Sequence, residues 1–272
     1  MTIQGTARRP RTPIPSAGHY RFGQAARLEW VKLRTLRSTW WTLAITVAGT
    51  VGIGVAVGLN TTTGSEDLTN NALAGVIPGL LLVGVMGVLS MTSEYTSGMI
   101  RATLAAVPRR RLAVAAKAAV FGGVSLALGE AASFASFFAG GFALRHGIAA
   151  PSLSQPGVLR AVVLTGAGYC LIGLLGIGLG SIIRHTGAAI AVLVAGIYIA
   201  AQFIGFLARG ALAYMPILIV GNSLATTKPL SCAAHGTQCP HFLSPWAGLT
   251  VLASYAAMAL LVGGWLLARR DA

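Results

Sequence analysis

The chain has 272 residues, of which 55% are hydrophobic and only 10% are charged. Because a soluble domain carries about 25% charged residues, this composition argues against a soluble protein and for a membrane domain. The net charge of +14 would favour nucleic-acid binding in a soluble protein. However, all but four Lys and Arg residues fall on one side once the apolar segments are counted as membrane spans. The positive-inside rule explains this bias, so we expect cytoplasmic termini and no nucleic acid.

The N-terminal residues precede the first apolar segment. Residues 1–19 combine prolines with basic residues, which is typical of a disordered cytoplasmic arm. No cleavable signal is expected, because no early apolar core leads to a small-residue cleavage site. Residues 20–39 have helical spacing, with Trp30 and Leu33 on one arc that Glu29 interrupts. We predict an amphipathic elbow helix in the headgroup layer; the alternative is an ordinary cytoplasmic lead-in helix.

Apolar segments of about 20 residues, the length that crosses a bilayer, dominate the rest of the chain. We predict one all-α, polytopic domain over residues 40–272, with six transmembrane helices at about 40–59, 72–91, 118–144, 158–183, 186–207 and 245–268. Closely spaced glycines within these spans predict tight helix packing. Residues 211–220 are apolar but too short to span, and Pro216 interrupts them. This pattern predicts an extracellular re-entrant hairpin before the last span.

Motifs for nucleotide hydrolysis are absent from the sequence. The GxxxxGK[ST] loop needs a lysine after a glycine, and none of the three lysines follows one. The GxSxG and HExxH patterns are also missing. We therefore expect this chain not to be an enzyme, and to hold no catalytic residue, cofactor or metal.

Two cysteines and two histidines lie close together in the outer loop before the last span. Their order, Cys232, His235, Cys239 and His241, could be drawn as a zinc site. An extracellular loop is oxidising, however, which favours a Cys232–Cys239 disulfide. The zinc site and unpaired thiols remain the alternatives.

Glu130 is the one acidic residue near the middle of a predicted span. An ionised carboxylate is costly in hydrocarbon, so such residues usually face a bundle interior or a wet cavity. Glu130 could therefore lie on a transport pathway. Alternatively, it is protonated and hydrogen-bonded to a neighbouring helix.

The segment between the second and third spans is the most informative one. It begins after the second span with Glu94, and it ends with Pro108 and a run of arginines. Ile100, Leu104 and Val107 recur at helical spacing, which predicts a short amphipathic helix on the cytoplasmic side. Its apolar ridge requires a partner surface, either lipid headgroups or a cytoplasmic protein.

This segment resembles the permease subunits of bacterial type-2 ABC exporters. The matching residues are Glu94, Gly98, Ile100, Arg101, Leu104, Pro108, Arg109 and Arg110; Met99 stands where the family often has Thr. The N-terminal elbow helix, the six spans and the hairpin are also similar, so the resemblance covers nearly the whole chain. It implies that residues 94–110 form the coupling helix, which transmits the closure of a separate ATPase subunit to the spans.

The resemblance also implies partners and a location. We expect a multi-pass cell-membrane protein that pairs with a second permease subunit and with ATP-binding cassette ATPase subunits. These ATPase subunits would supply ATP and Mg, and the complex would export a drug, a lipid or a peptide-like substrate. The alternatives are a secondary transporter or channel, which Glu130 favours, and a non-transporting membrane scaffold.

Overall fold

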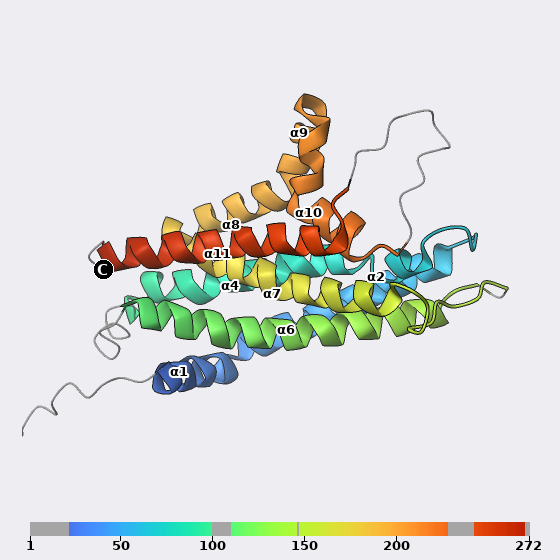
Figure 1. The fold of residues 1–272 in the computed structure, drawn as a ribbon. Coiled ribbons are helices and arrows are strands. Elements are labelled where there is room, and N and C mark those ends of the chain that lie inside the picture. Colours follow the sequence, from blue (N-terminus) through green and yellow to red (C-terminus); the bar gives the residue numbers. More distant parts are fainter. Residues whose placement is uncertain (1–21, 100–109, 146, 228–241, 270–272) are drawn as a thin grey trace, which may run out of the picture.

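The computed structural model describes residues 22–99, 110–145, 147–227 and 242–269, and these residues form helices and loops without strands. Five long helices run side by side along one axis (Figure 1): α2 (Arg37–Asn60), α4 (Val76–Thr96), α6 (Arg110–Phe142), α7 (Val158–Ile183) and α11 (Pro245–Arg269). Each is long and apolar enough to cross a membrane. The fold is therefore that of an all-α, multi-span membrane protein.

The surface of α2 shows why this bundle suits a lipid environment. Its buried residues are Thr39, Thr46, Thr50, Gly54 and Gly58. Its exposed residues include Trp41, Ile45, Ile53 and Leu59. Small and polar residues face inward and large apolar residues face outward, which is the reverse of the pattern in a water-soluble helix. Such an outer surface is stable in hydrocarbon and would aggregate in water.

Helix α7 forms the centre of the bundle, because it packs against α4, α6 and α11. The side chains of Tyr169, Ile172 and Ile177 on this helix are fully buried. The hydroxyl groups of Tyr169 and Thr50 are 2.8 Å apart and form a buried hydrogen bond between α7 and α2. Such a bond satisfies two polar groups that would otherwise be stranded in an apolar interior.

Glycines bring the backbones of α4 and α7 into direct contact. A Cβ atom at Gly176 would overlap the carbonyl oxygen of Gly84, and one at Gly87 would overlap the carbonyl oxygen of Gly173. Lipid provides no hydrophobic drive between helices, so close backbone packing of this kind supplies much of the attraction.

The second predicted span begins later than expected and extends further. Residues 68–72 form a separate short helix, α3 (Leu68–Ala72), and α4 begins only at Val76. The side chain of Asp67 caps α3 by accepting a hydrogen bond from the Asn70 amide, with an N···O distance of 3.2 Å. Ser136 of α6 then donates to the carbonyl oxygen of Ala72 at 2.6 Å, which holds the break between α3 and α4 against α6.

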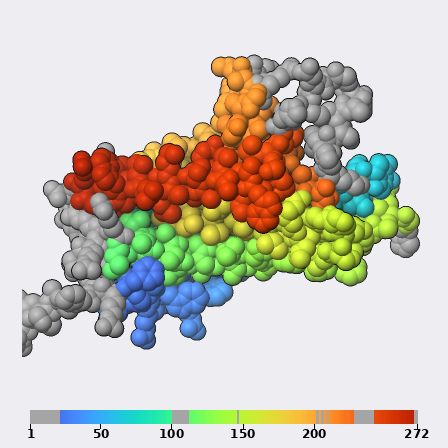
Figure 2. Space-filling view, in the orientation of Figure 1, coloured from blue at the N-terminus to red at the C-terminus, as the bar shows by residue number. Residues whose placement is uncertain are grey.

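The fifth predicted span, residues 186–207, is not one straight helix. It consists of α8 (Thr186–Val194), the π-helical turn η1 (Ala195–Ile199) and α9 (Ala200–Leu207). Figures 1 and 2 show α8 lying along the bundle and α9 projecting away from it. A π-helical turn often redirects a helix. Among the described residues, this segment therefore provides a shorter apolar helix over Thr186–Ile199 rather than a sixth long one.

The chain then returns to the bundle through three short helices. These are η2 (Arg209–Tyr214), α10 (Pro216–Leu218) and η3 (Ile219–Leu224). Pro216 starts α10, where the missing amide hydrogen is not needed. Ile219 and Leu224 are fully buried, and η3 packs against α7 and α11. The short apolar segment before the last long helix is thus part of the core, while its re-entrant position in a membrane stays a prediction.

The glycine contact between α4 and α7 predicts opposite effects for two matched substitutions. Gly176→Ala forces a methyl group against the backbone of α4 and should lower the free energy of unfolding by about 1–3 kcal/mol. Gly52→Ala on α2 meets nothing within 4 Å, so it should gain up to about 1 kcal/mol of helix propensity. Unfolding in mixed detergent–sodium dodecyl sulfate micelles measures both. Equal changes would contradict the assigned contact.

Candidate functional site

The amphipathic helix α1 (Phe22–Thr35) lies at one end of the bundle, beside α6. Figure 1 views α1 almost along its axis while the long helices run across the picture, so α1 lies crosswise to them. Its buried residues are Ala25 and Glu29, one helical turn apart on the same face. Ala25 packs against Ala116 of α6. This contact places the Glu29 carboxylate inside the structure.

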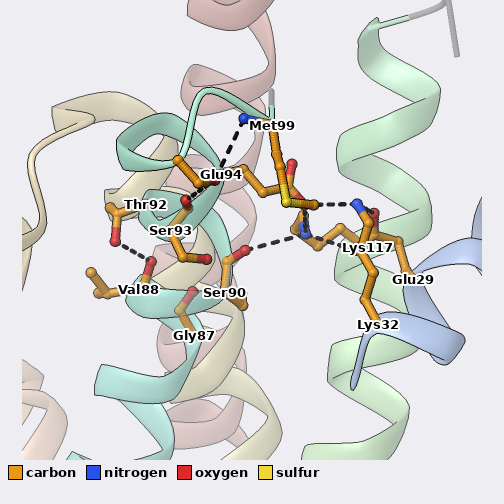
Figure 3. Close-up of polar contacts among 11 residues, drawn as sticks. Glu29, Lys32, Gly87, Val88, Ser90, Thr92, Ser93, Glu94, Met99 and Lys117 are labelled. Atoms are coloured by element: carbon orange, nitrogen blue, oxygen red, sulfur yellow. Dashed lines mark hydrogen bonds and ion pairs between the residues drawn. The ribbon is translucent and has the colours of Figure 1, made fainter. Parts of the chain in front are cut away.

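Four charged side chains meet at the point where α1, α4 and α6 come together (Figure 3). We call Glu29 and Lys32 of α1, Glu94 of α4 and Lys117 of α6 the charge cluster. The Lys117 ammonium lies 2.6 Å from Glu29 and 2.7 Å from Glu94. The Lys32 ammonium lies 2.9 Å from each of the same two carboxylates. Each cation therefore bridges both anions, and the cluster as a whole is neutral.

Lys117 is the most constrained member of the charge cluster. Only 7% of its surface is exposed, and the exposed fractions of Glu29 and Glu94 are 7% and 5%. Its ammonium also donates to the carbonyl oxygen of Ser90 at 3.2 Å, so all three of its donors have partners. A buried charge is tolerated only with such pairing, because desolvation costs several kcal/mol per ion.

Lys32 completes the charge cluster on its more exposed side. Burial acts to lower the pKa of Lys32, but the hydrogen bonds and negative charges of Glu29 and Glu94 outweigh it and raise the pKa above the ordinary value of 10.5. A base whose pKa is raised on folding stabilises the folded protein fully at any pH below its pKa in the unfolded chain. This stabilisation is lost only as the pH rises through the pKa of the folded protein. Lys32 is therefore a cation at neutral pH.

The charge cluster brackets the segment that the sequence singled out, residues 94–110. Glu94 lies on the last turns of α4, where it is buried and not on the surface. Gly98 follows with a φ angle of +69°, a conformation that glycine adopts without strain at the end of a helix. Beyond the segment, α6 begins at Arg110, and Lys117 lies about two turns later. The helices on the two sides of the segment, α4 and α6, are thus joined to each other through the charge cluster.

The other residues of the predicted coupling helix lie outside the described part of the chain. They are Ile100, Arg101, Leu104, Pro108 and Arg109. The backbone of Arg110 opens α6, while its side chain is not among those described. A coupling role for residues 94–110 therefore stays a prediction.

Sequence reasoning missed three members of the charge cluster. Glu29 was recognised only as an interruption of the apolar arc, and Lys32 and Lys117 were not singled out. A signal was present, because two of the chain's three lysines and two of its six acidic residues meet here. Charges are rare in this composition, so each one within or beside an apolar helix is costly and calls for a partner.

A second contact joins α4 to the turn between α7 and α8. Arg184 forms this turn with a φ angle of +61°, in the left-handed region that is unusual for a residue other than glycine. Its guanidinium lies 5.3 Å from the centre of the Tyr95 ring, a cation–π distance. Tyr95 follows Glu94 directly, so the end of α4 is held from two sides.

Glu130 lies on α6 at the interface with α7. Its carboxylate occupies the space beside Gly166, where a Cβ atom would come within 3 Å of it. It forms no hydrogen bond or ion pair with the rest of the described chain. Both proposed roles of Glu130, on a pathway and as a protonated structural group, stay predictions.

The loop that carries Cys232, His235, Cys239 and His241 is outside the described residues. The predicted disulfide and its alternatives are therefore untested. Cys170 on α7 is a half-buried free thiol. Over the described ranges, no group of three or more His, Cys, Asp and Glu residues comes together to bind a metal ion.

Comparison with protein-family models and with curated proteins gives no match for this chain.

Removal of Lys117 should be the most damaging single change in the charge cluster. Lys117→Met leaves two buried carboxylates with only the peripheral Lys32 between them, so we expect a loss of about 3–5 kcal/mol in unfolding free energy. Unfolding in mixed micelles, as above, provides the measurement.

Two further variants serve as controls for Lys117→Met. Lys32→Met should cost less, because 29% of that side chain is exposed. The double variant Lys117→Met/Glu94→Met restores neutrality and should recover part of the loss. If Lys117→Met costs no more than Lys32→Met, the central role of Lys117 is wrong.

Proposed function

We propose that this chain is the membrane permease subunit of an ATP-driven exporter of the type-2 ABC class. The observation that carries the proposal is the charge cluster, which joins α1, α4 and α6 on either side of residues 94–110. A segment that receives force from a partner must be attached rigidly to the helices that move. Four mutually paired, mostly buried charges provide such an attachment.

The mechanism assigns each part of the cluster a mechanical task. A separate ATPase subunit closes on ATP and Mg and pushes residues 94–110. Glu94 passes the displacement to Lys117 on α6 and, through it, to Glu29 on α1. Because α4 and α7 are in backbone contact, the whole bundle then rocks against that of the second permease subunit, in a motion of the kind used for alternating access.

Several features of the proposal extend beyond the five long helices. The segment 186–207 would act as a sixth crossing, and residues 211–224 would form the extracellular hairpin. Both termini would be cytoplasmic, because basic residues gather at the end of the bundle that carries the charge cluster: α1 lies there, Arg184 contacts Tyr95 at the end of α4, and α11 ends there with Arg269. A second permease subunit and two ATPase subunits would complete the complex, which would export a drug, a lipid or a peptide-like substrate.

One other function has a specific observation in its favour. Glu130 is an acidic residue within a long apolar helix, and such residues often mark ion or substrate pathways. A secondary transporter or channel would need further polar groups near Glu130 to form a relay. Glu130 lies against Gly166 and forms no hydrogen bond or ion pair with the described residues, so we favour the ATP-driven mechanism.

The decisive experiment combines the chain with an ATP-binding cassette ATPase subunit, to be sought first among the proteins encoded beside it. The two proteins are purified together in lipid nanodiscs, and ATP hydrolysis is measured with and without the permease. Arg101→Glu and Leu104→Asp should each reduce the permease-dependent stimulation by about fivefold or more, the ordinary lower range of coupling between sites. Arg145→Glu reverses the same charge beyond the other end of α6 and should leave the stimulation intact.

Three outcomes would count against the proposal. Full stimulation in both Arg101→Glu and Leu104→Asp would remove the coupling role of residues 94–110. Transport that continues without any ATPase would favour the secondary transporter. Purification from native membranes with no ATPase attached would favour a membrane scaffold.

A further inference from the structure

A groove lies between α6 and the side of α1 that carries Arg27 and Trp30. Its volume is about 590 Å³, and its walls include Gly23, Arg27 and Trp30 of α1 and Ala119, Gly123 and Ala127 of α6. The α6 wall consists of small and apolar residues. The α1 wall adds one cation and one large aromatic ring. The groove is therefore apolar along its length and positively charged at one place.

Arg27 differs from the lysines of the charge cluster because it has no partner in the described chain. Lys32 and Lys117 are paired with carboxylates, whereas Arg27 is exposed and forms no hydrogen bond or ion pair with the described residues. An unpaired guanidinium beside an apolar groove offers a phosphate group two parallel hydrogen bonds and a full charge.

The glycines of the groove are not used for helix packing. A Cβ atom at Gly23 or Gly123 would meet nothing within 4 Å. The glycines between α4 and α7 are different, because a Cβ atom there would overlap the opposite backbone. At Gly23 and Gly123, the missing side chain leaves open space that a ligand can fill.

We propose that this groove is a binding site for an anionic phospholipid. One acyl chain lies along Ala119, Gly123 and Ala127, and the phosphate binds the Arg27 guanidinium. Trp30 is half exposed and lies at the boundary between headgroup and chain, the level at which tryptophan is most stable in a bilayer. Basic pockets beside membrane helices recognise anionic headgroups in this way.

The site has a structural consequence for α1. The helix that forms one wall of the groove also carries Glu29 and Lys32, so a bound lipid would brace α1 against α6 from the side opposite the charge cluster. The binding site itself does not depend on the proposed transport function, because it requires only α1 and α6. Its test therefore needs no ATPase.

The test uses Trp30 as a reporter in the full-length chain. The other tryptophans, Trp40, Trp41, Trp246 and Trp265, are replaced by phenylalanine; each is at least 44% exposed, so the fold should tolerate the change. The protein in neutral detergent is titrated with phosphatidylglycerol or phosphatidylcholine that carries bromine on the acyl chain. Bromine quenches tryptophan only at contact, so quenching reports a chain in the groove.

We expect phosphatidylglycerol to quench Trp30 at about fivefold lower concentration than phosphatidylcholine, because the choline cation of phosphatidylcholine offsets the phosphate charge that attracts Arg27, whereas phosphatidylglycerol is a net anion. Arg27→Gln should abolish this preference. Arg34→Gln, which removes another exposed arginine of α1 that does not line the groove, should retain most of it. Gly123→Leu should prevent quenching by either lipid, whereas Gly52→Leu, at an equally open glycine on α2, should not.

Two results would overturn the proposal. One is equal quenching by the two lipids, or an unchanged preference in Arg27→Gln. The other is undiminished quenching in Gly123→Leu. If the single-tryptophan protein does not fold, native mass spectrometry of the otherwise unsubstituted chain replaces the reporter: phosphatidylglycerol retained equally by Arg27→Gln and by the parent chain would equally refute the site.

Discussion

One lysine at the edge of the bundle determines how three helices fit together. Lys117 extends from α6 to a carboxylate on α1 and to another on α4, at distances of 2.6 and 2.7 Å. Because all three groups are almost fully buried, none can exchange its partner for water without a large loss of solvation energy. The position of α1, the end of α4 and the first turns of α6 therefore depend on one another. Unlike a surface ion pair, which contributes little, this arrangement has a single satisfactory geometry.

Away from this cluster, a different interaction holds the helices together. Glycines let α4 and α7 approach to backbone contact, and the buried pair of Tyr169 and Thr50 joins α7 to α2. Van der Waals packing of this kind fixes the positions of the helices through their shape, but it forms no specific bond between individual side chains. The charge cluster and the Arg184–Tyr95 contact add specific attachments at the end of α4. A bundle with a close-packed centre and one such end would suit the proposed transfer of force at that end.

The two sides of α1 have different chemistry, which relates the transport proposal to the lipid site. Its inner side carries Glu29 and Lys32, whose charges are paired within the protein. Its outer side carries Arg27 and Trp30, which are exposed. Ion pairs within the chain hold the inner side of α1, and an anionic lipid would hold its outer side. The helix therefore lies where the composition of the membrane and the state of residues 94–110 could both affect its position.

Composition and hydropathy alone were enough to predict the class of the protein and the limits of two of the long helices. Spans of apolar residues predicted the last long helix within one residue and the fourth span as α7 without error, because length and hydropathy alone decide whether a segment crosses a membrane. The division of residues 186–207 by a π-helical turn, and the early break between α3 and α4, depend on contacts with distant helices. Hydropathy is a local property of the sequence, so it does not predict those contacts. The charge cluster shows the same limit. Glu29, Glu94 and Lys117 are far apart in the chain, and only the crossing of α1 over α6 decides that their charges neutralise one another.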